Sequence, residues 1–216
     1  MLYMISVEEQ SLLKTLGNIP FEAHVLRNMF SRYQSPEKKI LQMVRDGYII
    51  RIKQGLYVVA PAVSGKLLVR ELIANHIYGP SYLSAHFALR HYGLIPERVT
   101  VMSSFTTRHT REFDTPVGLY TYRQVNSDYF PIGITTAHDE EVNYLIATPE
   151  KALCDMIMVE HHIQAQSLSA LATFLEEDMR IDLAELKGMN LDIIRRCRET
   201  GIKKQILTNL LKLIER

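Results

Sequence analysis

The chain has 216 residues, of which 47% are hydrophobic and 23% are charged, and its formal net charge is +1. This composition argues against a disordered or low-complexity chain and leaves room for two small domains. No stretch reaches the roughly 18 apolar residues of a membrane span. Glu8 and Glu9 stand where a signal peptide would be apolar. We therefore expect a cytoplasmic protein with no membrane partner.

The near-zero net charge conceals blocks of opposite sign. Residues 1–62 hold eight Lys and Arg against five Asp and Glu, whereas residues 137–185 hold eleven acidic residues against two basic ones. Residues 186–216 reverse the sign again, with eight basic residues against three acidic ones. The sequence therefore predicts a basic first part, an acidic middle and a basic helical end.

Two amphipathic helices are expected in the first 30 residues. Ser6 and Glu9 have the spacing of a capping box, in which each side chain accepts a hydrogen bond from the other residue's backbone N–H. The helix that they start is expected to end at Gly17. A second helix is predicted over residues 20–30, where apolar residues recur at helical spacing.

A third helix is predicted to start at Ser35 and to stop at Gly47. Ser35 suits the N-cap and Pro36 the first helical position, because Pro fixes φ and has no N–H to leave unpaired. The apolar residues expected on its inward face are Ile40, Leu41 and Val44. The polar residues expected on its solvent side are Lys38, Lys39, Gln42 and Arg45.

A β-hairpin over residues 48–59 is expected next, with its turn at Gln54 and Gly55. Three helices followed by a hairpin is the order of a winged helix-turn-helix, and residues 25–62 carry the excess of basic residues that binding to duplex DNA requires. The candidate DNA-binding residues are Arg32, Ser35, Lys38, Lys39, Gln42, Arg45, Arg51, Lys53 and Gln54. The alternative is a winged helix that contacts only proteins, with these charges solvated.

Residues 60–65 are the predicted linker, because small residues, Pro and Gly interrupt both the helical and the strand spacing of apolar residues there. The linker divides a winged helix-turn-helix domain (1–62) from a second domain (66–216). Helices are expected over 66–77 and 84–92, and strands over 98–105, 110–113, 117–122 and 142–147. Thr148 and Pro149 start a helix that runs to residue 159. Further helices are expected over 167–177, 182–187, 191–200 and 202–214. The fold class is therefore α+β, an N-terminal winged helix-turn-helix followed by a mixed α+β domain with a helical C-terminal end.

Three segments in this order carry a family resemblance. They read RDGYIIRIKQGLY over residues 45–57, YLSAHFALRHYGL over 82–94 and ATPEKALCD over 147–155. With the helices before them, they resemble the AbiEi family, the antitoxins and transcriptional autoregulators of type IV toxin–antitoxin, or abortive-infection, systems. The resemblance covers roughly residues 5–160, and the helical tail matches only in character.

The resemblance implies a bacterial protein whose first domain binds inverted repeats at its own promoter. Its second domain would counteract a toxin of nucleotidyltransferase type. Carried over by position, the recognition-helix residues are Lys38, Lys39, Gln42 and Arg45, and the wing residues are Arg51, Lys53 and Gln54. One departure is the charge of residues 63–216, which hold seventeen Lys and Arg against nineteen Asp and Glu where the family is commonly basic. A local basic patch remains at Lys187, Arg195, Arg196, Arg198, Lys203 and Lys204.

No constellation in the sequence indicates an enzyme, so no catalytic residue, metal ligand or cofactor is predicted. His161 and His162 are adjacent and His86 and His91 are five apart, whereas a zinc helix needs its ligands at i and i+4. Cys154 has acidic neighbours, which disfavour a thiolate nucleophile. Each of the two cysteines is expected to be a buried small hydrophobe.

Two polar loops leave alternatives open. Residues 108–111 (RHTR) either contact phosphate or form an ordinary hairpin turn. Residues 138–141 (HDEE) are expected to be a solvated acidic turn, with metal binding as the lesser alternative because no second set of ligands has matching spacing. The leading functional hypothesis is a DNA-binding antitoxin and autorepressor. The second is a winged-helix regulator whose C-terminal domain senses a small molecule, and the third is an adaptor that does not bind DNA.

Overall fold

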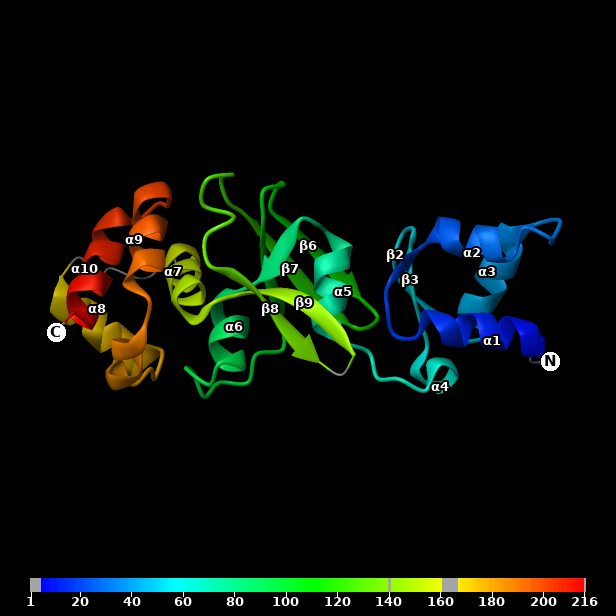
Figure 1. Cartoon of the computed structure of the whole chain (residues 1–216), viewed down its shortest axis with the longest axis horizontal. Helices are drawn as coiled ribbons and strands as arrows, with labels where there is room; N and C mark the ends of the chain where they lie inside the picture. The colour runs from blue at the N-terminus through cyan, green and yellow to red at the C-terminus, as the bar shows by residue number, and fades with distance from the viewer. Residues whose placement is uncertain (1–4, 140, 161–166, 216) are drawn as a thin grey trace.

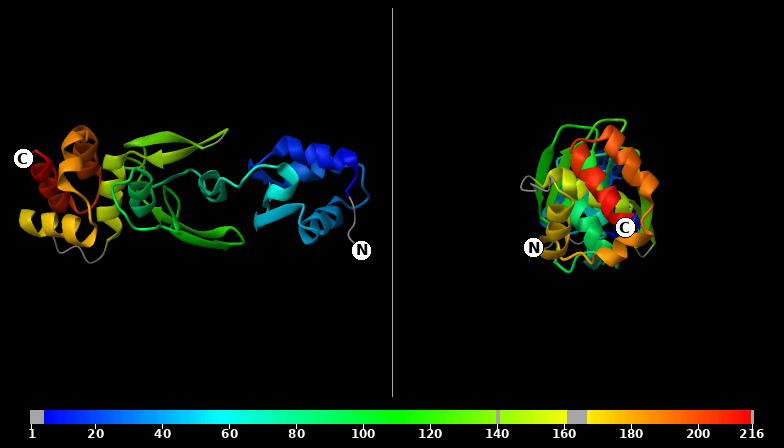
Figure 2. Two further views of the ribbon diagram at one scale, coloured as in Figure 1. Left: turned by 90° about the horizontal axis from the view of Figure 1, so that it is seen from below. Right: turned by 90° about the vertical axis from the view of Figure 1, so that its left-hand side faces the viewer.

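The computed structural model of the chain describes residues 5–139, 141–160 and 167–215. It has a mixed α+β fold, and the molecule is elongated, with the N-terminal helices at one end, a β-sheet in the middle and the C-terminal helices at the other end (Figure 1). Figure 2 shows the narrow outline of the molecule when it is seen along its long axis. Within the described residues, no helix has both the length and the apolar character needed to cross a membrane.

The N-terminal unit, residues 5–65, has its own core and a small antiparallel sheet in the order β1-β3-β2. Its elements are α1 (Val7–Leu16), β1 (Phe21–Glu22), α2 (Ala23–Met29), α3 (Pro36–Arg45), β2 (Ile49–Lys53), β3 (Leu56–Val59) and α4 (Pro61–Ser64). The capping box of α1 is confirmed, since Ser6 accepts from the Glu9 N–H and Glu9 accepts from the Ser6 N–H. Gly17, with a φ of 58°, ends that helix as predicted.

The helix predicted over residues 20–30 is wrong at its start. Phe21 and Glu22 form strand β1, which pairs with Tyr57 and Leu56 of β3, and helix α2 begins only at Ala23. The rings of Phe21 and Tyr57 stack with their centroids 6.4 Å apart. Pairing with a strand more than 30 residues away therefore overrides the local helical pattern.

Helix α3 and the hairpin lie where the sequence predicts them, but the buried face of α3 differs. Ile40 is buried as expected, whereas the Leu41 side chain is 47% exposed. Met43, which the pattern did not select, is buried instead. Ser35 occupies the N-cap position of α3, but its side chain makes no capping hydrogen bond. The helix is thus rotated relative to the predicted face, and this rotation determines which of its polar residues reach solvent.

The two faces of the small sheet pack against different cores. Tyr57 and Val59 of β3 belong to the N-terminal core. Ile52 of β2 and Leu56 and Val58 of β3 belong to the core of the C-terminal unit. The hairpin therefore packs on both sides and contributes side chains to both cores.

The predicted linker is partly helical. Pro61–Ser64 form the single turn α4, Gly65 follows with a φ of 73°, and Val63 is buried in the N-terminal core. The helix expected over residues 66–77 begins later, at Arg70, so the irregular connection covers residues 65–69. The Asn18 side chain donates to the Leu67 carbonyl across this connection, which adds a further contact between the two units.

A six-stranded mixed sheet, in the order β6-β7-β5-β4-β9-β8, is the centre of the C-terminal unit. Its strands are β4 (Ser81–Leu83), β5 (Met102–Thr106), β6 (Arg111–Thr115), β7 (Gly118–Gln124), β8 (Ile134–Asp139) and β9 (Val142–Ala147). The pairs β5–β7 and β4–β9 are parallel, and the other neighbours are antiparallel. Strands β4 and β8 were not predicted. His138 and Asp139, expected in a solvated turn, form the end of β8.

Helices flank the sheet and fill the C-terminal end (Figure 1). They are α5 (Arg70–Ile77), α6 (Ala85–His91), α7 (Pro149–Val159), α8 (Leu168–Thr173), a π-helical turn (Phe174–Asp178), a 3-10 helix (Leu183–Gly188), α9 (Leu191–Thr200) and α10 (Lys204–Ile214). The predicted start of α7 is confirmed, since Thr148 accepts a hydrogen bond from the Lys151 N–H and Pro149 is the first helical residue. Ser84 and Gly93 flank α6 as predicted, with a φ of 78° at Gly93.

Candidate nucleic-acid interface

Three exposed cations lie on α3 and on the strand that follows it. Lys38 and Arg45 project from α3 and Arg51 from β2, and all three are exposed. Within residues 5–139, 141–160 and 167–215, none of them has an acidic partner. Unpaired, exposed cations are free to neutralise phosphates, so these three residues are the best candidates for contacts to a nucleic-acid backbone.

Two further arginines of the same unit already have acidic partners. Arg32 pairs with Glu8 at 3.0 Å, and Arg27 pairs with Glu37 at 3.2 Å. Both pairs are solvent-exposed, so they add little to stability and can be broken at small cost. Arg32, which was predicted to bind DNA, therefore contributes less net positive charge than the three unpaired residues.

Lys39 is not on the solvent side of α3, contrary to the sequence prediction. Its side chain is 8% exposed, and its ammonium lies 2.9 Å from the carboxylate of Glu9, which is 2% exposed. The Tyr33 hydroxyl donates to the same carboxylate at 2.6 Å. Burial raises the pKa of Glu9, but the hydrogen bonds from Tyr33, Lys39 and the Ser6 backbone outweigh it and lower that pKa to about 2. Lys39 therefore joins α3 to α1, and its ammonium is not exposed for a phosphate contact in this structure.

Gln42 is half-buried on α3, and its amide donates to both carboxylate oxygens of Asp46 at 2.9 Å. An amide at this position can read an adenine edge if it turns away from Asp46. We expect Gln42→Ala to relax the preference at one operator position, at a cost of about 1–3 kcal/mol in discrimination. Competition binding with single-base operator variants measures this, with Gln34→Ala as the control. An unaltered specificity profile would rule out base reading by Gln42.

The tip of the hairpin faces the C-terminal unit. Lys53 is half-buried, donates to the Ile77 carbonyl and lies 5.5 Å from the centre of the Phe113 ring. Gln54 beside it is exposed. These two residues, predicted to lie on a free wing, therefore lie at the junction of the two units.

Three cations meet at this junction and form what we term the junction cluster: Lys53, Arg108 and Arg111. Arg108 lies 4.4 Å from the centre of the Tyr78 ring, and Arg111 lies 5.0 Å from that of Phe113. Together with Gln54 these residues line a hollow of about 420 Å³ that has no acidic lining residue. Burial lowers the pKa of Lys53, the charges of Arg108 and Arg111 lower it further, and the charge of Glu22 raises it. Three cations around a hollow that has no carboxylate in its lining favour an anion there.

The basic patch predicted near the C-terminus is largely committed to contacts within the protein. Arg195 pairs with Glu215 at 3.0 Å, and Arg198 lies 3.7 Å from Glu199. The Lys203 ammonium donates to backbone carbonyls of Ile157 and Glu160. The remaining members, Lys187, Arg196 and Lys204, are exposed.

The segment over residues 147–155 contributes two charged residues to the core. Lys151 and Asp155 are fully buried, with 3.6 Å between the ammonium and the carboxylate. Asp155 also accepts hydrogen bonds from Ser84 and Tyr129, each at 2.6 Å, and Lys151 donates to the Tyr129 carbonyl at 2.9 Å. Burial raises the pKa of Asp155. This network joins α7 to the start of α6. Ser84 of the segment 82–94 and Asp155 of the segment 147–155 therefore meet in the core, although they are far apart in the sequence.

The structure gives no support to the enzymatic constellations considered above. No group of three His, Cys, Asp or Glu side chains that could hold a metal ion occurs in the described part of the chain. The Nε2 atom of His86 lies 3.5 Å from the Glu160 carboxylate, while His161 and His162 lie outside the described residues. Cys154 and Cys197 are both buried, as predicted.

Comparison with known proteins adds no assignment. No family model matches the chain, and no curated protein sequence matches it. A function is therefore inferred from the exposed side chains and from the order of the helices and strands.

Proposed function

We propose that this chain is a DNA-binding antitoxin and transcriptional autorepressor that counteracts a nucleotidyltransferase-type toxin in the bacterial cytoplasm. The observation that carries the DNA-binding part is the set of unpaired exposed cations on α3 and β2, namely Lys38, Arg45 and Arg51. Phosphate contacts of this kind supply most of the affinity of a protein for duplex DNA.

The order of elements supports a winged helix-turn-helix as the DNA-binding domain. Three helices precede a hairpin, and a short strand before α2 closes the sheet onto that hairpin. In this motif the third helix enters the major groove and the hairpin contacts the adjacent backbone. We expect Arg51, which is exposed on β2, to make such a backbone contact, and the junction cluster to bind a further phosphate beside the hairpin tip.

The antitoxin part of the proposal depends on the resemblance of three segments to the AbiEi family. Two of these segments supply the buried network of Ser84, Lys151 and Asp155, so they specify the core of the C-terminal unit. The proposed partners are duplex DNA with inverted repeats at the chain's own promoter and the toxin encoded beside it.

The two activities should separate in a full-length variant. Lys38→Ala, Arg45→Ala and Arg51→Ala together are expected to abolish promoter repression while preserving growth rescue on coexpression with the neighbouring gene product. The reason is that the three side chains are exposed on the N-terminal unit, whereas toxin antagonism is assigned to the C-terminal unit. Reporter expression and colony counts measure the two activities.

Point variants are preferable to fragments here. A cut at residue 65 would remove Ile52, Leu56 and Val58 from the core of the C-terminal unit. Failure of the wild-type chain to rescue growth would overturn the antitoxin proposal. Loss of both activities in a variant that melts like the wild type would show that toxin neutralisation needs the DNA-binding face.

A further inference from the structure

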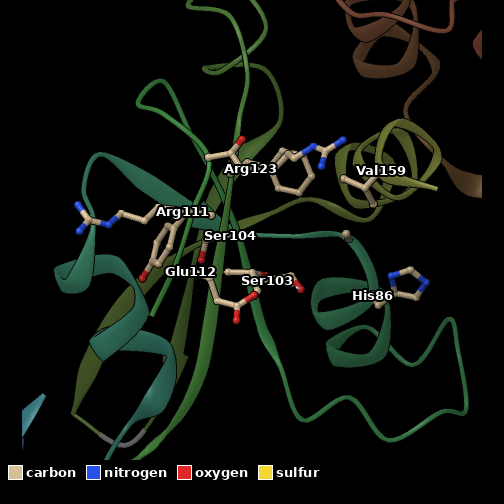
Figure 3. A pocket seen from close by; sticks show the side chains of 12 residues that line it. His86, Ser103, Ser104, Arg111, Glu112, Arg123 and Val159 are labelled. Atoms are coloured by element: carbon tan, nitrogen blue, oxygen red, sulfur yellow. Dashed lines mark hydrogen bonds between the residues drawn. The ribbon is translucent and has the colours of Figure 1, made fainter. Parts of the chain in front are cut away.

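A polar hollow lies on the face of the central sheet that carries α6 and α7. Its volume is about 480 Å³, and it is lined by strands β5, β6 and β7, by the start of α6 and by the end of α7 (Figure 3). Pockets for small organic ligands have volumes of roughly 300–1,000 Å³. This hollow therefore has room for a metabolite, and the DNA-binding proposal makes no use of it.

Two unpaired charges of opposite sign line the hollow. Glu112 on β6 and Arg123 on β7 are both exposed, and neither has an ion-pair partner among the residues that the structure describes. Glu112 is opposite Thr121 in the β6–β7 ladder, and Arg123 is two residues further along β7, so both project from one face of the sheet. They nevertheless do not pair, because their charged ends point in different directions (Figure 3).

The space between these two charges is lined by neutral polar and apolar groups. Ser103 and Thr121 lie on neighbouring strands with their hydroxyl oxygens 3.5 Å apart. Phe105 and Val159 supply apolar surface. Arg111 also borders the hollow, but its guanidinium lies over the Phe113 ring and is turned away from Glu112 and Arg123 (Figure 3).

The positive end of the hollow is reinforced by a second cation. Lys203, at the start of α10, is near enough to Arg123 for their charges to interact: burial lowers the pKa of Lys203, the nearby Glu160 carboxylate raises it, and the charge of Arg123 lowers it. The Lys203 ammonium also donates to the Ile157 carbonyl at the end of α7. An anionic group of a ligand is therefore favoured at the Arg123 end and disfavoured beside Glu112.

The wall on the α6 side is held rigidly. The Ser84 hydroxyl donates to the buried Asp155, and the Ser84 N–H donates to the Ser103 carbonyl at 2.9 Å. Ala85, the next residue and part of the lining, has a φ of 51°, a conformation that is unfavourable for alanine. Non-glycine residues persist in this conformation only where their surroundings hold them, and such residues gather at ligand sites.

We propose that this hollow binds a small zwitterion, a free α-amino acid with an apolar side chain. The carboxylate would pair with Arg123, the ammonium with Glu112, and the side chain would contact Phe105 and Val159. A phosphorylated ligand fits less well, because it would place its charge against Glu112. Binding at this site is independent of DNA binding by the N-terminal unit, so either property can be present without the other.

The test is direct binding to the full-length protein. The twenty standard L-amino acids are titrated at millimolar concentration by isothermal calorimetry, and a binder is compared with its analogues that lack the amino group or the carboxyl group. For L-leucine these are 4-methylpentanoate and isoamylamine. We expect an apolar amino acid to bind and each analogue to bind about 10- to 150-fold more weakly, because each lacks one charge-assisted hydrogen bond. Amide resonances of Ser103 and Thr121 should shift on titration.

Substitutions of the two charged residues test whether the ligand binds in this hollow. Glu112→Gln and Arg123→Gln are expected to weaken binding by a similar factor, about 10- to 150-fold. The controls are Asp114→Asn, which removes a carboxylate from the same strand, and Arg98→Gln, which removes an exposed cation elsewhere; both should bind like the wild type. The proposal fails if none of the twenty amino acids binds, if the analogues bind as tightly as the parent, or if Glu112→Gln leaves the affinity unchanged.

Discussion

Replacing Lys38, Arg45 and Arg51 together by alanine is expected to reduce binding to promoter DNA to the level of non-specific background. Each lost phosphate contact should flatten the slope of log K against log salt by roughly 0.9, so the three together should flatten it by roughly 2.7. All three side chains are exposed and lack an acidic partner within the described ranges of the chain. Their removal should therefore change the free energy of unfolding by less than about 0.5 kcal/mol each.

A variant with the same loss of charge is the control. Arg90, Arg98 and Lys212 are exposed residues of the C-terminal unit, and their replacement by alanine lowers the net charge by the same amount. Gel-shift titrations at several salt concentrations should leave this control with nearly the wild-type slope. Equal losses in both variants would mean that net charge, and not the face formed by α3 and β2, determines affinity.

The junction cluster is tested with the same assay. If DNA extends from α3 past the hairpin tip, Arg108→Gln with Arg111→Gln should flatten the salt slope by roughly 1.8. Both changes remove charge from exposed side chains of the 420 Å³ hollow. An unchanged slope would restrict the DNA contact to the N-terminal unit.

The elements whose ends carry strong local signals could be predicted from the sequence. Ser6, Thr148 and Gly93 fix helix ends through their own capping or backbone preferences, and the structure places helix ends at all three. Helix α9 has the predicted bounds of residues 191–200. Such signals act within a few residues of chain, which is why one sequence suffices to detect them.

The errors occur where pairing with another strand decides the structure. Phe21 lies in a helical pattern but pairs with Tyr57, a distant residue, in a sheet. Strand β8, which contains His138, is polar and partly exposed, and it pairs with β9, the next strand of the chain. The polar composition of β8 hides this strand from a search for apolar runs, because what stabilises a strand is its neighbour and not its own composition.

The burial of Lys39 in the candidate site could not be predicted from the sequence either. Lys38 and Lys39 are adjacent, and the helical pattern expected both to face solvent. The actual rotation of α3 leaves Leu41 exposed and buries Lys39 against Glu9. Only the presence of a carboxylate on α1, 30 residues earlier, makes a buried lysine possible there. Glu112 and Arg123 were missed because the hollow that they line is completed by α6 and α7, which the sequence does not place over these strands.

The pair formed by Lys39 and Glu9 gives the second large expected effect, on stability. Lys39→Met leaves the buried Glu9 carboxylate without its cation, and breaking such a pair from one side costs about 3–5 kcal/mol. That is a large part of the 5–15 kcal/mol typical of a whole domain. Lys38→Met, one residue away and exposed, should cost less than about 0.5 kcal/mol. Urea unfolding followed by circular dichroism measures both variants.

The pH dependence provides an independent check of the same pair. Because the folded protein lowers the pKa of Glu9 from 4.5 to about 2, the ionised carboxylate stabilises the folded state at pH values above 4.5. This stabilisation, on the order of 3 kcal/mol, should be lost as the pH falls from 4.5 to 2. In Lys39→Met the loss over this range should shrink, since one of the groups that lowers the pKa is gone. Glu9→Gln combined with Lys39→Met should recover part of the stability, because it leaves no unpaired charge. A Lys39→Met protein that unfolds like the wild type but binds DNA weakly would instead place Lys39 at the DNA surface.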